Sequence, residues 1–346
     1  MCTGTHQCHA WISLHSVGLL YQGCLRDPEW LLGLDVLCCQ SFCHSAVYVD
    51  LPGRRLTRLQ TVSQGAFGYI DLASYETKEE GKREVYVKRP ILAGRSLLME
   101  ACVQMKVREC LMRAGFSTGA PRVLQIFRLS NRSVCFAMDP IDGASTMDHI
   151  LTSAPPSKRT SIIVDCLLQL CSMVWHLAND LGLNHRDLKP SNFLLVERPA
   201  PIMKVITVDT EILQIASSYS LTLIDFGFSC MGTPETQVSS LSLSYVYSKE
   251  DPCPKEGRDI FLFIGLLYME FYDSLTEGLR ILFEQWLDIP HASVRVCEEL
   301  RKAQLNGAST EQCSLWLYGI AGHEEIKSFA CCPLRIVKDL QEYQSR

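Results

Sequence analysis

Two short stretches of this 346-residue chain combine acidic, basic and amide side chains and lie next to apolar segments. Residues 185–192 read HRDLKPSN and lie between a long apolar segment and a short apolar strand. Residues 223–227 read LIDFG, which is typical of a strand that runs into a glycine turn. Asn192 and Asp225 would offer hard oxygen ligands, the kind that Mg²⁺ prefers. One such aspartate alone is usually a helix cap or a turn residue, so the interpretation rests on both stretches together.

The two stretches resemble the catalytic loop and the magnesium loop of the eukaryotic-type protein kinase family. The resemblance covers about residues 56–346. It implies that Asp187 accepts the proton of an attacking hydroxyl and that Lys189 neutralises charge on the transferring phosphate. It also implies that Asn192 and Asp225 hold Mg²⁺ beside ATP. Lys189 favours a Ser/Thr kinase, because tyrosine kinases usually have a different residue there.

The stretch SQGAFGYI, which begins at Ser63, resembles the family's Gly-rich loop with its first glycine replaced. It lies between two predicted strands, upstream of the strand VYVK that ends at Lys88. By resemblance, Gly65 and Gly68 would let backbone amides approach the phosphates, and Phe67 would cover the tip of the loop. Lys88 would contact the α- and β-phosphates of ATP.

A helix that begins near Ser96 should carry the glutamate that holds Lys88. The candidates are Glu100, twelve residues after Lys88, and Glu109, two to three helical turns further on. We favour Glu100, because a residue one turn into the helix can face the sheet. The other glutamate is expected to be a solvated residue on the helix surface.

The resemblance also implies an adenine site. Its residues would be a gatekeeper, a hinge whose backbone binds the base, and two apolar side chains on either side of the ring: Met138, Asp139 to Ile141, Ile70 and Leu194. Core packing would explain each of these side chains equally well, and the two roles do not exclude each other. Tyr86 stands where the family has a small alanine, so we expect a restricted adenine pocket.

Three departures from the family pattern stand out. No APE motif precedes the helix that begins near Asp259, although this aspartate matches the residue that braces the catalytic loop. The interval from Asp187 to Asp225 is long, and residues 197–220 are expected to form an added hairpin that turns at residues 209–210. The missing motif and the long interval are similar to divergent kinases of large DNA viruses.

The pattern of predicted elements indicates an α+β class with two lobes, the bilobal protein-kinase fold. Short alternating strands and one main helix dominate up to Met138, whereas apolar helical periodicity dominates beyond it. We therefore predict a Cys-rich extension of unknown role, a small antiparallel β-rich N-lobe with the hinge, and a larger α-helical C-lobe, at residues 1–55, 56–142 and 143–346.

Composition limits the partners of the chain. Its 33 basic and 38 acidic side chains give a net charge of −5, which does not favour nucleic acid or an anionic membrane. No uninterrupted apolar run is long enough to span a bilayer, and the start lacks the basic stretch of a secretory signal. We expect a monomer that acts on a protein substrate in the cytoplasm or the nucleus.

Cysteine is abundant, with 17 residues in the chain. A disulfide framework is not expected, because such frameworks belong to short secreted chains with too little core. The cluster Cys38, Cys39, Cys43 and His44 has zinc-ligand residue types without the usual paired spacing, so reduced thiols are the expected alternative.

The main alternative to an active kinase is a pseudokinase that acts as a nucleotide-binding or scaffolding module. Ser63, Tyr86 and the missing APE motif favour it, whereas the retained lysine and magnesium residues oppose it. A small-molecule phosphotransferase is a third possibility, but such enzymes typically lack the full HRDLKPxN motif. Phosphorylation control would act on residues 231–247 through Arg186, and we favour a segment that is ordered without phosphate.

Overall fold

The computed structural model describes residues 36–38, 47–51, 53–65, 68–232, 238–239, 251–289 and 295–345. The chain divides into a unit of residues 1–34 and a unit of residues 35–346, and the described residues all belong to the second. Two strands within the expected N-terminal extension, at residues 36–38 and 47–51, pair into the N-terminal sheet.

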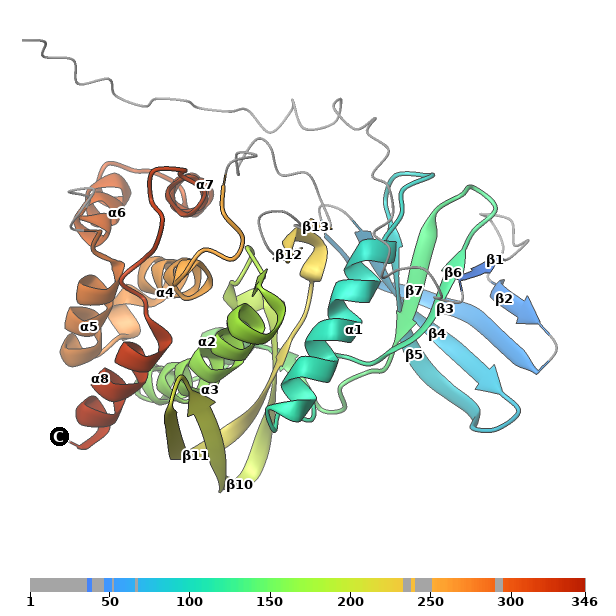
Figure 1. Ribbon diagram of the computed structural model, residues 1–346, viewed down its shortest axis with the longest axis horizontal. Coiled ribbons are helices and arrows are strands. Elements are labelled where there is room, and N and C mark those ends of the chain that lie inside the picture. Colours follow the sequence, from blue (N-terminus) through green and yellow to red (C-terminus); the bar gives the residue numbers. More distant parts are fainter. Residues whose placement is uncertain are drawn as a thin grey trace, which may run out of the picture. The chain divides into compact units, whose positions relative to one another are not determined.

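The N-terminal part of the second unit is a seven-stranded sheet with one helix (Figure 1). In sheet order the strands are β1 (Val36–Cys38), β6 (Val123–Arg128), β7 (Val134–Met138), β5 (Gly81–Pro90), β4 (Gly68–Thr77), β3 (Arg54–Gln64) and β2 (Val47–Leu51). Only β1 and β6 pair in parallel, and the remaining pairs are antiparallel. Helix α1 (Leu98–Arg113) contacts β6 and β7 of the sheet. It also contacts α3 (Pro156–Leu181) and η4 (Phe226–Phe228) of the helical part.

A buried carboxylate ties the outer strands of this sheet together. Asp71 of β4 accepts hydrogen bonds from Tyr48 of β2, from Thr61 Oγ1 of β3 at 2.5 Å and from Arg89 Nε of β5 at 2.6 Å. Burial opposes ionisation of Asp71, but these donors outweigh it and lower the pKa of the carboxyl below its usual value. Tyr48 lies outside the predicted N-lobe of residues 56–142, and its hydrogen bond to Asp71 helps to join β2 to the sheet.

The C-terminal part is mostly helical. Its helices are α2 (Met147–Ser153), α3 (Pro156–Leu181), α4 (Arg258–Phe271), α5 (Glu277–Leu287), α6 (Val296–Leu305), α7 (Thr310–Ala321) and α8 (Pro333–Ser345), with the short 3₁₀ helices η3 (Pro190–Asn192), η4 (Phe226–Phe228) and η5 (Tyr272–Ser274). Short strands β8 (Ser145–Thr146), β9 (Leu183–Asn184), β12 (Cys230–Met231) and β13 (Val238–Ser239) complete it, together with the long hairpin described below. The β-rich first part and the helical second part confirm the predicted α+β class.

Helices α3 and α4 form the centre of the helical part. In α4 every residue from 258 to 269 is buried, as its nearly all-apolar sequence predicts. Helix α3 begins at Pro156, and proline suits the first turn of a helix. Within the described residues, α3 is long and apolar enough to cross a membrane by length and composition, but 72% of its most apolar window is buried inside the protein.

A long hairpin separates the two sequence motifs, as predicted. Strand β10 (Phe193–Val208) pairs with β11 (Glu211–Leu223), and the chain turns at residues 209–210. Asp209 adopts a left-handed backbone (φ 56°), a conformation that aspartate tolerates better than most residues. The hairpin packs on α3, where Ser172 Oγ donates to the Thr207 carbonyl at 2.7 Å.

One disulfide is present among the described cysteines, although the sequence predicts no disulfide framework. Cys230 and Cys253 form a disulfide, with their Cα atoms 6.3 Å apart, because the chain returns to β12 just before α4 begins. Other described cysteines carry free thiols, and most of these are buried as small apolar residues: Cys102, Cys110, Cys135, Cys166, Cys171, Cys297, Cys313, Cys331 and, half-buried, Cys332. In the proposed zinc cluster only the backbone of Cys38 is described, and the other three residues lie outside the described residues.

Candidate active site

Lys88 connects three elements of the candidate site. It lies in β5, forms an ion pair with Glu100 of α1, and donates to Asp225 Oδ1 at 2.8 Å. The structure thus pairs Lys88 with the glutamate favoured from the sequence. Glu109 is exposed and contacts Arg113 at 2.8 Å on the helix surface instead.

The charges of this group stabilise one another. Burial alone would lower the pKa of Lys88, but the carboxylates of Glu100 and Asp225 raise it above its ordinary value. Desolvation opposes ionisation of Asp225, yet the positive charge of Lys88 lowers the pKa of Asp225 to about 2. The Asp225 side chain remains 47% exposed, so a charged carboxylate faces solvent beside a buried lysine.

Two glycines are required by close contacts around Lys88. A Cβ on Gly68 would lie 2.9 Å from the Arg89 carbonyl oxygen, so this glycine permits the close approach of β4 and β5. A Cβ on Gly227 would lie 3.1 Å from Asp225 Oδ1 and 3.5 Å from Glu100 Oε2. The glycine that follows residues 225–226 therefore leaves room for the two carboxylates that hold Lys88.

Helix α4 fixes the backbone of the loop of residues 185–192. Asp259, buried near the start of α4, accepts from the backbone N–H of His185 at 2.8 Å and of Arg186 at 2.9 Å. These bonds support Arg186 in a left-handed backbone conformation (φ 67°), which a non-glycine residue rarely adopts. The predicted bracing role of Asp259 is confirmed. His185 also packs against Phe226, with ring centroids 5.0 Å apart.

Asp187 is buried in this loop and fully engaged. Lys189 Nζ donates to Asp187 Oδ2 at 2.9 Å and to Oδ1 at 3.2 Å. Asn192 Nδ2 donates to Asp187 Oδ2 at 2.8 Å and to the Asp187 carbonyl at 2.8 Å. The hydroxyl of Tyr318, in α7, donates to Asp187 Oδ1. Lys189 and Asn192 belong to the predicted catalytic loop with other roles, towards the phosphate and Mg²⁺, whereas Tyr318 carries no signal in the sequence.

The residues predicted to hold Mg²⁺ fit that ion. The two hydrogen bonds from Asn192 to Asp187 use its Nδ2 atom, so its Oδ1 atom is the one that would bind the ion. The Asn192 carbonyl accepts from the backbone N–H of Ile224 at 3.1 Å, which brings the residue before Asp225 beside Asn192. One amide oxygen and one carboxylate, with phosphates and water, form an oxygen ligand set suited to Mg²⁺.

Two of the predicted adenine residues, Ile70 and Met138, lie on strands β4 and β7, which both pair with β5. Tyr86 of β5 is in register with Met138 of β7, and Ile70 of β4 is in register with Lys88. Ile70, Met138, Ile141 and Leu194 are all half-buried. Half-buried apolar side chains suit a flat ring, but they also suit packing, so their role in binding adenine stays a prediction.

The hinge contains ion pairs that the sequence analysis missed. Asp139 accepts from Arg83 Nη1 at 2.8 Å and from Arg122 Nε at 2.6 Å. The hydrogen bond to Asp139 raises the pKa of Arg122 above its ordinary value. The Asp139 side chain is therefore engaged in fixing the hinge, and its backbone N–H also donates to the Arg122 carbonyl at 2.9 Å.

The predicted Gly-rich loop connects β3 and β4. Ser63 is exposed at the end of β3, and the Gly65 N–H donates to the Gly68 carbonyl at 2.9 Å across the turn. Gly65 has no close neighbour that a side chain would strike. Phe67 lies outside the described residues, so its predicted place at the loop tip is not described.

A second buried charge cluster lies beside Arg186. Asp251 accepts from Arg258 Nη2 at 2.6 Å and lies 2.7 Å from Lys255 Nζ and 3.5 Å from Arg186 Nη2. The Asp251 side chain is completely buried among these cations. An internal carboxylate thus already faces the arginine that precedes Asp187.

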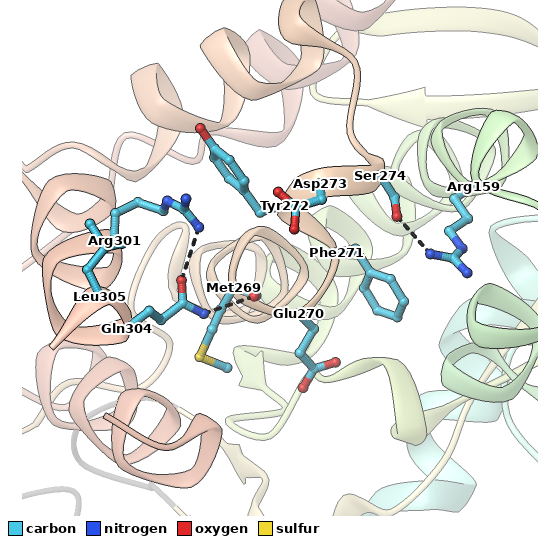
Figure 2. Close-up of a pocket in the computed structure, with 10 residues that line it drawn as sticks. All are labelled: Arg159, Met269, Glu270, Phe271, Tyr272, Asp273, Ser274, Arg301, Gln304 and Leu305. Carbon is cyan, nitrogen blue, oxygen red and sulfur yellow. Dashed lines mark hydrogen bonds between the residues drawn. The ribbon is translucent and has the colours of Figure 1, made fainter. Parts of the chain in front are cut away.

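The chain also has a hollow of about 390 Å³ at the C-terminal end of α4, shown in Figure 2. Arg159 donates to Ser274 Oγ at 2.7 Å and Gln304 donates to the Met269 carbonyl at 3.1 Å along its wall. None of the site residues predicted from the sequence lines it. We assign no ligand to this hollow.

Comparison with known proteins adds little to this geometry. No protein-family model matches the chain, and no curated protein matches it. Among solved structures, it is similar to the crystal structure of the BubR1 kinase domain, with a TM-score of 0.42 and 14% identity over 91% of this chain and 93% of that chain. A likeness this distant carries no argument about activity.

Proposed function

We propose that this chain is an ATP-dependent Ser/Thr protein kinase, which transfers the γ-phosphoryl group of ATP to protein hydroxyls. The observation that supports it best is Lys88, which contacts Glu100 of α1 and Asp225 together. Burial of a lysine with two carboxylates carries a desolvation cost that their attraction only partly offsets, and such buried, charge-coupled groups cluster at functional sites. Here the charge stands beside a half-exposed carboxylate suited to Mg²⁺.

The proposed reaction divides the work among the chain's own residues. Asp187 accepts the proton of the attacking hydroxyl, and Lys189 stabilises negative charge on the transferring phosphoryl group. Lys88 holds the non-transferred phosphates of ATP, and Asp225 with Asn192 would hold Mg²⁺. That ion, when bound, neutralises the phosphate oxygens and positions them for in-line transfer.

Two isosteric variants test this proposal. Asp187→Asn should lower transfer of labelled γ-phosphate from ATP to dephosphorylated casein by about a hundredfold or more, because the proton acceptor is lost. Asp225→Asn should abolish transfer and also weaken Mg²⁺-dependent nucleotide binding, which Asp187→Asn should leave unchanged. Asp180→Asn, at the exposed end of α3, is the matched control and should retain activity.

The outcomes separate a kinase from a nucleotide-binding module. If Asp187→Asn or Asp225→Asn transferred phosphate at the wild-type rate, the roles assigned to these residues would be wrong. Nucleotide binding without transfer by the wild type would favour the pseudokinase alternative, for which Ser63 and Tyr86 are the supporting residues. A monomer acting on protein substrates in the cytoplasm or nucleus, without nucleic acid or membrane, remains our prediction, as does the likeness to kinases of large DNA viruses.

A further inference from the structure

The hydroxyl of Tyr318 is hydrogen-bonded to Asp187, the carboxylate that should receive the proton of the substrate's acceptor hydroxyl. A carboxylate offers about four lone-pair sites for hydrogen bonds. At Asp187 the described side chains fill four: Tyr318 and Lys189 on Oδ1, and Lys189 and Asn192 on Oδ2. The Asp187 side chain is also only 5% exposed, so an acceptor hydroxyl has neither a free lone pair nor an open path.

Orientation of Asp187 does not depend on Tyr318. Asn192 holds both the carboxylate and the carbonyl of Asp187, and Lys189 contacts both carboxylate oxygens. Lys189 and Asn192 belong to the same loop as Asp187, and Asp259 fixes the backbone of that loop. The contact from Tyr318 therefore covers Asp187 without being needed to position it.

Helix α7 carries Tyr318 to this place by tight packing on α4. A Cβ on Gly265 of α4 would lie 3.0 Å from Leu317 Cδ2, so a larger residue there would press on the Leu317 side chain. At the other end, buried Lys255 Nζ donates to the carbonyls of Ala321 at 3.1 Å and His323 at 3.0 Å. Because the helix is anchored, rotation of the Tyr318 side chain is the simplest way to uncover Asp187.

From these contacts we propose that Tyr318 occupies the acceptor-hydroxyl position, so that a protein substrate must displace its phenol before Asp187 can accept a proton. This inference rests on the proposed kinase function. Acceptor hydroxyls compete with the Tyr318 phenol for Asp187. Displacement of the phenol therefore weakens binding of the protein substrate but not binding of ATP.

The test is Tyr318→Phe in the full chain, assayed with ATP and dephosphorylated casein. Phenylalanine keeps the ring but cannot donate to Asp187. The apparent KM for casein should fall about tenfold, as expected for removal of one competing hydrogen bond to a charged group. The kcat should change by less than about twofold, and the KM for ATP should not change. The matched control is Tyr343→Phe in α8. It removes a 2.6 Å hydrogen bond between the Tyr343 hydroxyl and Thr276 Oγ1, and it should behave as the wild type.

A thermal-unfolding cycle tests the contact without relying on activity. The Tm shift of Tyr318→Phe combined with Asp187→Ala should be smaller than the sum of the single shifts, because each single variant already removes the bond between the two side chains. Additive shifts would overturn the contact itself. A lower kcat in Tyr318→Phe would instead assign Tyr318 to positioning, and unchanged kinetics or ATP-dependent phosphate on Tyr318 would each overturn the proposal.

The failure of this inference and of the proposed function can be told apart. If Tyr318→Phe transfers phosphate with the wild-type KM for casein, only the competition by Tyr318 is wrong. If neither protein transfers phosphate although both bind ATP with Mg²⁺, the kinase function is wrong and the displacement step falls with it.

Discussion

Tyr86 brings a phenol to the strand face that also carries Lys88. Alternate residues of a strand share one face, so Tyr86 and Lys88 of β5 lie on the same side of the sheet. Lys88 reaches Asp225 from this face, and Tyr86 is in register with Met138, the predicted gatekeeper. The half-buried phenol therefore lies where adenine is expected to bind.

We expect Tyr86→Ala to tighten ATP binding or to admit bulkier adenine analogues, because the substitution removes the ring from the base site. Isothermal titration with Mg²⁺ and each nucleotide measures the change. Inorganic triphosphate, which lacks adenine, is the control ligand and should bind both proteins equally. Unchanged affinity together with unchanged analogue tolerance would count against the alignment of residues 85–88 with the kinase strand.

At the residue scale, the sequence predicts what short motifs encode and misses what distant contacts create. Lys88, Asp187 and Asp225 could be predicted because each stands in a local pattern whose residue types are set by chemistry. Tyr318 lies 131 positions from Asp187, and Asp251 lies 65 positions from Arg186. Neither has a local signal, because only the packing of α7 and of the segment before α4 brings them to the loop.

At the element scale, the β10–β11 hairpin could be predicted from a local pattern, whereas the first two strands could not. The hairpin could be predicted because two apolar, β-branched runs flank an Asp-Thr turn. Strands β1 and β2 come from a segment without regular alternation, and their place depends on pairing with β6 and β3. Their inclusion in the sheet is a tertiary effect that no local pattern indicates.

The segment between β12 and α4 should not need phosphorylation for activity. Asp251 already faces Arg186 at 3.5 Å, so a negative charge occupies the side of this arginine where a phosphate would pair. We expect the initial rate of phosphate transfer to casein to stay within about twofold after phosphatase treatment. A large loss that autophosphorylation of residues 231–247 restores would contradict this.

Asp251→Asn provides a separate check of the same cluster. Without the carboxylate, Arg186, Lys255 and Arg258 would remain buried with less compensation. Loss of one partner from a buried ion cluster typically costs about 3–5 kcal/mol. Denaturant unfolding should therefore show a clear loss of stability, whereas the exposed pair variant Glu298→Gln, which loses a surface contact to Arg295, should show almost none.

The disulfide closes the same segment covalently, since Cys230 follows η4 and Cys253 precedes α4. Both residues are buried. Under non-reducing conditions, replacing both by alanine should lower the free energy of unfolding by about 2–4 kcal/mol, because the cross-link restricts the unfolded chain. Cys332→Ala, at a half-buried free thiol, is the control. A non-reduced digest in which residues 230 and 253 fall in unlinked peptides would refute the bond.

At the scale of the whole molecule, the added hairpin is joined to α3 by a buried polar cluster. Gln169 of α3 donates to Asp165 Oδ1 at 2.9 Å and to Ser217 Oγ of β11 at 3.0 Å. Lys204 of β10 donates to Gln169 Oε1 at 3.0 Å and lies 4.0 Å from the centre of the Phe116 ring. The β10–β11 hairpin is thus part of the packed structure. Because its Lys204 is a titratable group in this cluster, the free energy of unfolding should depend on pH.

Lys204 sets the direction of that dependence. Burial and then the charge of Arg198 lower the pKa of Lys204 from 10.5 to about 8. Between pH 8 and 10.5 the unfolded chain would therefore hold a proton at Lys204 that the folded chain has lost. Under that condition stability rises with pH, so the contribution of Lys204 to the free energy of unfolding should increase through this window.

Lys204→Met removes this contribution and isolates it from all other titrating groups. The free energy of unfolding of the variant minus that of the wild type should decrease by about 1–3 kcal/mol between pH 7.5 and 10.5. Urea unfolding at a series of pH values measures this difference. Between pH 5 and 7 both states of the wild type hold the proton, so the difference should be flat and serves as the internal control. A difference that stays constant up to pH 10.5 would mean that Lys204 is not held in the cluster beneath the hairpin, and that the insertion packs on α3 without it.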